Sequence, residues 1–361
     1  MRLGWVELRD FRNHAETRLD DLGEGVHTFV GANGEGKTNL LEGIAFLFFL
    51  QSPRSSSTEP LVRREADGPA YTRGEVETAQ GRVLIEIEIP GQGANRVQVN
   101  RSPVRRRVDV RRQVRAVYFG PEDLVIAIGD PSKRREFVDD AIRSLWPAKG
   151  SAMSGYDRVL RQRNRLLKEW EGRGAPKELP TWDEQLVEAG SALMRLRQQA
   201  VDRLAPGASE EYEHLAGYGL SCRYAPNVAG EPIEERFADR LEERRGDELV
   251  RRTTLVGPHR DELELQVREL GARSFASHGE AWGAALCLRL ALAWAVAEEL
   301  GDPPVVLLDD PFSALDPRRQ VRVAARLAGR GQVFVTVADD AHVPETSVAV
   351  WDVAAGSVGA R

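Results

Sequence analysis

The sequence predicts an α/β fold: a head of mixed sheets and helices with a helical second lobe inserted into it. Strand-like apolar runs fill both ends of the chain, whereas residues 131–249 show a helical pattern. A glycine-rich turn at residues 31–38 joins a strand-like run to a helical run. The apolar run 305–308 ends in two aspartates, as a buried parallel strand does. At 361 residues the chain exceeds one usual compact core, which favours two domains or an insertion.

Composition indicates a soluble chain and argues against two kinds of site. The N-terminus MRLGWVELRD is charged at once, so we expect no signal peptide and a cytoplasmic protein. The most apolar stretch, 281–297, contains Arg289 and falls short of a bilayer span, which predicts a buried helix and no membrane contact. Cys222 and Cys287 match neither a disulfide framework nor a metal spacing.

The first part of the chain shows strand patterns around one helix. We expect strands in GWVELRDF (4–11) and HTFVGANG (27–34), and a helix in TNLLEGIAFLFFL (38–50). Residues 74–100 predict a hairpin region that turns at PGQGAN, and AVYFGPEDLVIAI (116–128) predicts a strand and a turn.

From Pro131 to about Leu249, long amphipathic patterns predict an inserted helical lobe. The expected helices lie in 132–146, 155–170 and 181–204, with a turn at GRGAPKELP. Strands return at TTLVGPHRDELEL, a loop then leads into a helix ending near 300, and VVLLDD and QVFVTV are buried strands. The predicted domains are therefore a discontinuous head, 1–130 with 250–361, and an insertion, 131–249.

GANGEGKT, residues 31–38, fits the phosphate-binding pattern G-x-x-x-x-G-K-[ST]. Glycines let the backbone turn its N–H groups around phosphate oxygens, and the following helix points its positive end at the same place. The chain has five lysines and 45 arginines, yet Lys37 stands here, because a slim point charge can thread the loop to the β and γ oxygens. A chance glycine-rich turn is the alternative. The predicted ATP-binding residues are Gly31, Ala32, Asn33, Gly34, Glu35, Gly36, Lys37, Thr38 and Asn39, with Asn33 near phosphate or water and Asn39 as local helix support.

VVLLDD, residues 305–310, predicts a buried strand whose end presents two carboxylates. Thr38 and Asp309 are the expected Mg²⁺ ligands, and Asp310 is expected to polarise the attacking water. Lys37, Asp310 and Ser277 are the candidate catalytic residues. A strand capped by acids before a turn is the alternative, and pairing with the glycine-rich loop argues against it.

SHGE, residues 277–280, is similar to the S-G-G-Q signature of ATP-binding-cassette (ABC) ATPases, and PFSALD (311–316) is similar to their dimer-contact loop. Ser277, the amide of Gly279 and a helix N-terminus would bind a γ-phosphate, although an ordinary N-cap is the alternative. Four motifs in this order predict a P-loop ABC-type ATPase head. The insertion between Lys37 and Ser277 is too short for the arms of SMC proteins and too long for transporter cassettes as we know them.

The whole chain resembles one family, RecF, the SMC-like recombination mediators of bacteria. The resemblance is carried by LRDFRNH (8–14), GANGEGKTNLLEGI (31–44), YFGPEDL (118–124), GDPSKRREFVDD (129–140), VGPHRDEL (256–263), ASHGE (276–280) and LLDDPFSALD (307–316). Three of these, GPEDL, the RRxF run and GPHRDEL, are not general cassette motifs.

The resemblance implies an ATP-dependent homodimer in which each nucleotide lies between the P-loop of one subunit and Ser277 of the other. It implies ATP-gated binding of double-stranded DNA and of single/double-strand junctions, with slow, DNA-stimulated hydrolysis. RecR and RecO are the implied partners, and help in loading RecA at gaps is the implied role. The alternatives are an ABC-type ATPase that does not act on DNA, and a scaffold in which ATP only holds the dimer together.

The sequence departs from the expected motifs at three points. Glu280 stands where many relatives carry Gln. No switch histidine follows the last strand, where Thr336 and Asp339 stand and His342 lies farther along. Gln113 is the candidate for the Q-loop.

Basic residues are the candidate DNA contacts. The run 101–115 carries seven arginines, and a solvated face is the alternative. Arg12 is expected near the nucleotide, with an exposed hairpin arginine as the alternative. His259 and Arg260 are expected to contact DNA or couple the lobes, with a structural role at a strand end as the alternative. The arginines named for DNA are Arg63, Arg64, Arg105, Arg106, Arg107, Arg111 and Arg112, with Arg158, Arg161, Arg163 and Arg165 as further candidates.

Overall fold

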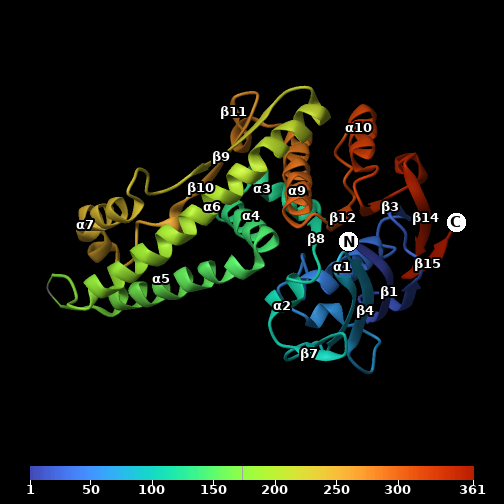
Figure 1. Cartoon of the computed structure of the whole chain (residues 1–361), viewed down its shortest axis with the longest axis horizontal. Coiled ribbons are helices and arrows are strands. Elements are labelled where there is room, and N and C mark those ends of the chain that lie inside the picture. Colours follow the sequence, from blue (N-terminus) through green and yellow to red (C-terminus); the bar gives the residue numbers. More distant parts are fainter. Residues whose placement is uncertain (173) are drawn as a thin grey trace. The chain divides into compact units, whose positions relative to one another are not determined.

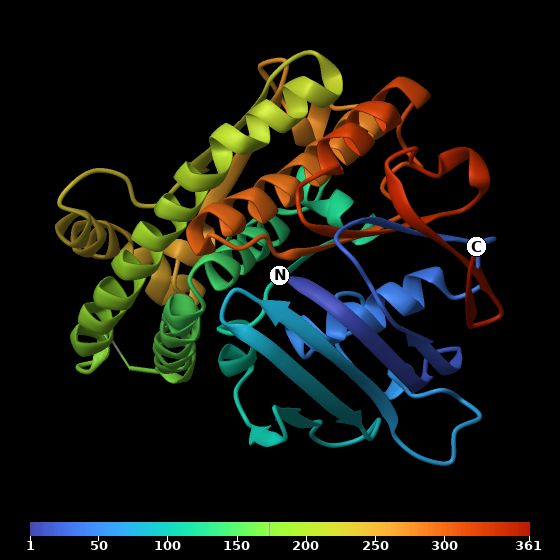
Figure 2. The ribbon, with the colours of Figure 1, turned by 45° about the vertical axis from the view of Figure 1, so that its right-hand side comes forward.

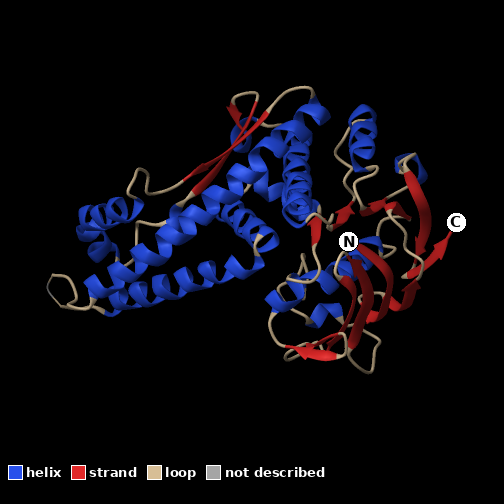
Figure 3. Ribbon diagram, in the orientation of Figure 1, coloured by secondary structure: helices blue, strands red, loops and turns tan. Residues whose placement is uncertain are grey.

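The computed structural model describes residues 1–172 and 174–361, which form two compact units. Unit 1 comprises Met1–Leu124, Gly207–Gly219 and Ala276–Arg361, and unit 2 comprises Val125–Pro206 and Leu220–Phe275. Strands predominate in unit 1 and helices in unit 2 (Figure 3). Whether the predicted lobes, with boundaries at 131 and 249, are the working lobes of the protein stays a prediction.

Unit 1 contains an antiparallel sheet in the order β2-β1-β4-β5-β6-β7. Figure 2 shows β1, β4 and β5 side by side. Buried and half-exposed residues alternate along β4 and β5, because one face of the sheet packs on a core and the other faces water. The strands are β1 (Arg2–Phe11), β2 (His14–Leu19), β4 (Ala70–Thr78), β5 (Gly81–Ile89), β6 (Arg96–Val99) and β7 (Ser102–Val104).

A second sheet of unit 1 has the order β15-β14-β3-β13-β12-β8, and all neighbours except β14 and β15 run parallel. Every residue of β12 and β13 is buried, as expected for central parallel strands covered on both faces. The strands are β3 (Gly25–Val30), β8 (Ala116–Phe119), β12 (Val305–Asp309), β13 (Gln332–Val337), β14 (Ser347–Ala354) and β15 (Ser357–Ala360).

Helix α1 (Lys37–Phe49) lies between these two sheets and contacts β1 and β4 of one and β8, β12 and β13 of the other. Its apolar residues are spread around the helix, as expected for a helix enclosed by protein. Leu40, Ile44 and Phe48 join the core of the unit. This sandwiched position fixes the start of α1, and with it the glycine-rich turn that precedes it.

Helix α9 (His278–Leu300) carries the most apolar stretch of the sequence. Among the described residues it is the one helix long and apolar enough to cross a membrane, and 83% of its apolar window is buried inside the protein. The prediction of a buried helix is thereby confirmed. The other helices of unit 1 are α2 (Arg107–Arg111) and α10 (Pro317–Leu327), with single 3₁₀ turns at Glu59–Leu61, Pro121–Asp123 and Asp340–His342.

Unit 2 is built on long helices beside a small sheet in the order β11-β10-β9. Helix α5 and the part of α6 in this unit lie alongside one another (Figure 1). The elements are α3 (Leu124–Ile128), α4 (Pro131–Leu145), α5 (Ser151–Glu169), α6 (Leu179–Ala216, which continues into unit 1), α7 (Ile233–Arg251), α8 (Ala272–Phe275), β9 (Leu220–Ala225), β10 (Glu262–Val267), β11 (Leu270–Gly271), and 3₁₀ turns at Pro147–Gly150 and Pro258–Arg260.

Three expectations about local structure were wrong in detail. Helix α6 does not stop near residue 204 but passes through Pro206 to Ala216. Residues 124–128, expected in a turn, form α3. TTLVGPHRDELEL is not one strand region, because Pro258–Arg260 make a 3₁₀ turn before β10 begins.

Candidate functional site

The glycine-rich turn connects β3 to α1 and is held by close backbone approaches. A Cβ on Gly31 would lie 2.2 Å from the carbonyl oxygen of Val353, so only glycine lets the turn pass β14. Gly36 has φ of 113°, a conformation that favours glycine, and caps the start of α1. The first N–H groups of α1 have no partners within the helix, so the turn is a place where an anion is favoured.

The side chain of Lys37 folds back into this turn. Its Nζ donates to the carbonyls of Gly31 at 2.6 Å and of Ala32 at 2.9 Å, and the residue is 7% exposed. Burial lowers the pKa of Lys37, while the charges of Asp310, Asp309 and Glu35 act in the opposite direction. A buried cation at the centre of an N–H-rich loop is suited to phosphate oxygens.

Asp309, at the end of β12, lies directly beside the start of α1. Its Oδ1 accepts hydrogen bonds from Thr38 Oγ1 at 2.9 Å and from Thr336 Oγ1 at 2.7 Å. Burial raises the pKa of Asp309, and the two hydroxyl donors oppose that rise. The structure thus brings together Thr38 and Asp309, which the sequence separates by 271 positions.

Asp310 follows in a left-handed conformation with φ of 51°, which is costly for a residue other than glycine. Its backbone N–H donates to Thr336 Oγ1 at 2.9 Å. Burial raises the pKa of Asp310, and the nearby charges of Lys37 and His342 lower it. The left-handed backbone of Asp310 thus stands just beyond β12, whose last residue is Asp309.

The turn after β1 braces the glycine-rich loop, a role that the sequence did not reveal for Asn13 and His14. Asn13 Nδ2 donates to the carbonyl of Glu35 at 3.1 Å, and His14 Nε2 lies 3.0 Å from the carbonyl of Gly36. Asn39 Nδ2 donates to Asn13 Oδ1 at 2.8 Å. Burial lowers the pKa of His14, so a neutral ring donates from Nε2. The motif LRDFRNH was the available signal for this brace.

Ser277 is the N-cap of α9. Its Oγ accepts from the backbone N–H of Glu280 at 3.3 Å, and the Glu280 side chain accepts from the Ser277 N–H at 2.9 Å, which completes a capping box. A capping box uses Glu or Gln equally, so Glu280 fills the place where Gln was expected. Within the described part of the chain no hydrogen bond joins Ser277 to the glycine-rich loop.

Gly279 faces the segment after β12. A Cβ there would lie 3.1 Å from the carbonyl oxygen of Ala314, so the signature-like turn and the PFSALD segment are packed together. Ser277 itself is exposed. The two features predicted to meet another subunit thus share one surface region of unit 1.

Other predicted residues have local partners. The Arg12 guanidinium donates to both carboxylate oxygens of the buried Glu42, each at 2.8 Å, so it is not an exposed hairpin arginine, and its place near the nucleotide stays a prediction. Gln113 Nε2 donates to the carbonyl of Asp109 at 3.1 Å. His342 Nδ1 lies 2.7 Å from Asp339 Oδ1, and Thr336 occupies the position beside Asp309. Asn33 is exposed on the loop.

The arginine run 101–115 is spread over a turn, β7, α2 and the segment that precedes β8. Arg105, Arg106, Arg107 and Arg112 are exposed, although Arg106 is paired with Asp109 at 3.0 Å. Arg107 donates to Gln51, and the guanidinium of Arg111 lies 5.5 Å from the centre of the Phe49 ring. Arg115 is buried, and burial lowers its pKa to about 10. Arg63 is paired with Asp10 at 2.8 Å, and Arg64 is exposed.

Two candidates in unit 2 prove structural. Arg163, offered as a DNA contact, is fully buried and bonds Asp183 at 2.8 Å, Glu248 at 2.6 Å and Thr254 at 2.8 Å, so that suggestion was wrong. His259 lies between the Tyr156 hydroxyl at 2.7 Å and the carbonyl of Thr254 at 3.1 Å. Among the alternatives for His259, the structural one is favoured.

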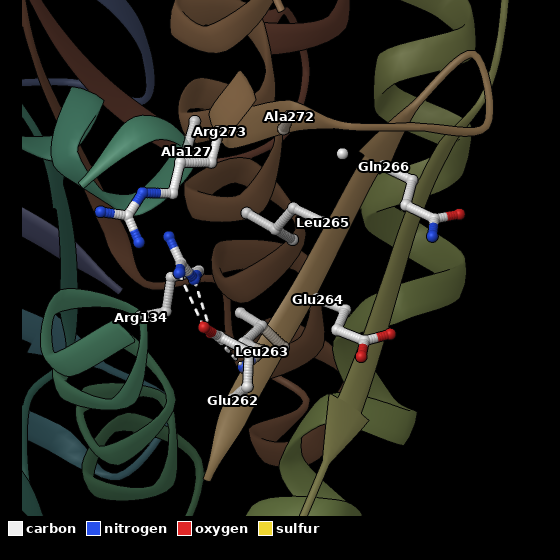
Figure 4. Close-up of a pocket in the computed structure, with 10 residues that line it drawn as sticks. Ala127, Arg134, Glu262, Leu263, Glu264, Leu265, Gln266, Ala272 and Arg273 are labelled. Atoms are coloured by element: carbon white, nitrogen blue, oxygen red, sulfur yellow. Dashed lines mark hydrogen bonds and ion pairs between the residues drawn. The ribbon is translucent and has the colours of Figure 1, made fainter. Parts of the chain in front are cut away.

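Unit 2 also has a cleft of about 260 Å³ along β10, shown in Figure 4. Leu263 and Leu265 line it, and its arginines are already in ion pairs: Arg134 with Glu262 at 2.6 Å and Arg273 with Asp130 at 3.0 Å. Such mutual pairing indicates a structural role for these charges.

The oxygen set of unit 1 fits a hard divalent cation. Mg²⁺ is usually held by one or two carboxylates or hydroxyls together with substrate phosphates, without a cage of protein ligands. Accordingly, no group of three or more His, Cys, Asp or Glu side chains converges on a metal-sized site among the described residues. Thr38 and Asp309 supply adjacent oxygens beside a phosphate-binding turn, which is the kind of donor set that Mg²⁺–polyphosphate needs.

Comparison with known proteins defines the family. The model of the RecF/RecN/SMC N terminal domain matches residues 2–355. The DNA replication and repair protein RecF of Streptomyces avermitilis is 42% identical over 95% of both chains, and that of Frankia alni is 40% identical over 99% of both. The chain belongs to the RecF family.

Solved structures agree with this membership. A structure titled as the recombination mediator protein RecF-ATP in the RecFOR pathway matches 100% of this chain and 97% of its own, with a TM-score of 0.89 and 28% identity. An Smc head domain from Pyrococcus furiosus, at 16% identity and a TM-score of 0.59, shares the fold. The predicted ABC-type, SMC-like α/β head is therefore confirmed, and the chain is placed among RecF proteins of DNA replication and repair.

Proposed function

We propose that this chain is an ATP-dependent DNA-binding protein of recombinational repair, working in the cytoplasm. The observation that carries the proposal is the junction of Lys37, Thr38 and Asp309 at the start of α1, in a chain of the RecF family. The relative titled as a RecF-ATP complex supports ATP as the nucleotide.

In this proposal Lys37 and the N–H groups of the glycine-rich turn hold the phosphates of ATP, and Thr38 and Asp309 hold Mg²⁺. Bound Mg²⁺ would neutralise phosphate charge. Asp310, whose pKa is raised by burial, would orient the attacking water and accept its proton. Hydrolysis is expected to be slow.

The surface position of Ser277 supports a dimer. Among the described residues Ser277 makes its hydrogen bonds within its own capping box and none to its own glycine-rich loop, so in this proposal its γ-phosphate contact is made to a second copy in head-to-tail arrangement. ATP would then join two copies around duplex DNA or a single/double-strand junction, and hydrolysis would release it. RecR and RecO would be the partners, and RecA loading at gaps the outcome.

Sedimentation velocity tests the proposal. The protein would be run with Mg²⁺ and no nucleotide, ADP or ATP, with and without a labelled duplex, beside Ser277→Arg. We expect ATP to produce a dimer that carries duplex, and Ser277→Arg to abolish both while ATP binding persists. A monomer in ATP, or a dimer that ignores DNA, would favour the ABC-type ATPase without a DNA role.

A second candidate function is a scaffold in which ATP only joins the two copies. Asp310, which has a left-handed backbone and is partly shielded from water, is the residue that tests this candidate. Asp310→Asn should leave DNA capture intact and prevent release. If capture and release both continue unchanged in this variant, hydrolysis is not the release step.

A further inference from the structure

Two buried oxygens next to the proposed nucleotide site lack hydrogen-bond partners. Tyr118 is 5% exposed, and its hydroxyl is among the buried polar atoms without a partner in the described chain. Glu122 Oε1 is another. Buried polar atoms are nearly always satisfied, so such atoms commonly mark the place of a water or an ion.

The sheet brings these groups to the edge where Asp309 lies. Strand β8 runs parallel to β12, and Leu307 pairs with Tyr118 and Leu308 with Phe119. Parallel strands present their carboxyl ends at one edge, so Tyr118 stands beside the strand end that carries Asp309. The charge of Asp309 acts on both Tyr118 and Glu122, and burial raises the pKa of Glu122.

Tyr118 and Glu122 face the same space. A Cβ on Gly120 would lie 2.6 Å from the Tyr118 hydroxyl and 2.9 Å from Glu122 Oε2, which places both polar ends over that glycine. The glycine is therefore needed for the two side chains to converge.

The turn that carries Glu122 is fixed from its other side. Asp123 Oδ2 accepts from the Gly120 N–H at 3.2 Å, and both oxygens of Asp123 accept from Arg289 of α9, at 2.7 and 3.1 Å. Both carboxylate oxygens of Asp123 are thus occupied in anchoring the turn. The adjacent Glu122 is held in place with one carboxylate oxygen still without a partner.

We propose that Tyr118 and Glu122 are positioning residues of the nucleotide site, which together hold a water bound to the divalent cation at Thr38 and Asp309. This inference rests on the proposed function. The Tyr118 hydroxyl would donate a hydrogen bond to the oxygen of this water, and the Glu122 carboxylate would accept a hydrogen bond from the water. The segment GPEDL would then take the role of the Q-loop, for which Gln113 was the only candidate from the sequence.

The Mg²⁺ requirement of nucleotide binding tests this role. Binding of a slowly hydrolysed fluorescent ATP analogue would be titrated with Mg²⁺ for wild type, Tyr118→Phe and Glu122→Gln. Partners in the outer shell of a metal typically change its affinity about 10–100-fold, and we expect a rise of that order in the Mg²⁺ midpoint for both variants. Mn²⁺ affinity in the same complexes, measured by electron paramagnetic resonance, should fall in parallel.

Matched variants separate this role from a structural one. Tyr71→Phe and Glu59→Gln change the same groups elsewhere in unit 1 and should leave the midpoint within twofold. Tyr118→Phe removes a buried hydroxyl that has no partner, so its melting temperature without nucleotide should equal or exceed that of wild type. If Glu122→Gln does not fold, Tyr118→Phe alone tests the proposal.

Binding of the analogue by wild type distinguishes failure of the proposed function from failure of this inference. If wild type does not bind the analogue, and so behaves like Lys37→Met, the proposed function fails and this inference falls with it. If wild type binds in a Mg²⁺-dependent manner and both variants keep its midpoint within twofold, the inference alone is overturned.

Discussion

Thr336 lies between the two aspartates of the candidate site. Its Oγ1 donates to Asp309 Oδ1 at 2.7 Å and accepts from the backbone N–H of Asp310 at 2.9 Å. One hydroxyl thereby holds a buried carboxylate and the left-handed backbone of the next residue. The end of β13 thus supplies a clamp, although the sequence suggested only a missing switch histidine there.

Thr336→Val should therefore destabilise the protein and misplace both carboxylates. The change is nearly isosteric but leaves a buried N–H and a buried carboxylate each short of one hydrogen bond, which costs about 1–3 kcal/mol. Denaturant unfolding measures this cost, and ATP turnover should fall with it. Thr336→Ser keeps the hydroxyl and is the control; equal stability of the Val and Ser variants would contradict the clamp.

Arg163→Ala should be among the most destabilising changes in unit 2. Arg163 is fully buried between Asp183 and Glu248, and removing it leaves the buried Glu248 without its cation and Asp183 with Arg245 alone, at 3.1 Å. Loss of one partner from such a cluster costs about 3–5 kcal/mol. Arg161→Ala, an exposed arginine on the same helix, should change the free energy of unfolding by less than about 0.5 kcal/mol. Similar unfolding midpoints for the two variants would refute the assignment.

The sequence predicted those parts of the site that depend on consecutive residues. The turn 31–38 between a strand and a helix, and the strand 305–309 that ends in aspartate, are local patterns. The structure has them where they were expected. The contact between the turn and the strand through Thr38 and Asp309 was expected, because these two residues were predicted as ligands of the same Mg²⁺.

Features that depend on tertiary packing were not predictable. Helix α6 continues through Pro206 because its later residues Ala208 and Tyr212 are buried, and that burial outweighs the local cost of proline. No sequence pattern indicated that Arg163 would be buried while Arg161 stays exposed. Nor did it indicate the brace by His14 or the convergence of Tyr118 and Glu122, since each joins segments that only the fold brings together.

Acidification should weaken unit 2 through His259. Burial lowers the pKa of His259 to about 4, below its ordinary value of 6.5. As the pH falls, the unfolded chain takes up the proton first, so this contribution to stability is complete above about pH 6.5 and is lost between about pH 6.5 and 4. The loss amounts to at most about 3 kcal/mol.

His259→Gln isolates this contribution, because His14 and His27 are buried too and shift in the same direction. Free energies of unfolding would be measured for wild type and variant from pH 7.5 to pH 4.5. The difference between them should shrink or change sign as the pH falls. A constant difference would mean that His259 does not titrate in this range.

The exposed arginines of 101–115 should govern how salt weakens DNA binding. Arg105, Arg107 and Arg112 are exposed and suited to phosphates, whereas Arg115 is buried. Each arginine that contacts a phosphate contributes about 0.9 to the slope of log affinity against log salt. Alanine at all three should make this slope shallower by up to about 2.7, with ATP binding unchanged.

Fluorescence anisotropy of a labelled duplex across a salt series measures this slope. Arg96→Ala, at an exposed arginine of β6 outside the run, is the control. An unchanged slope in the triple variant would make the run an ordinary solvated face, and the DNA contacts would have to be sought on other arginines such as Arg64.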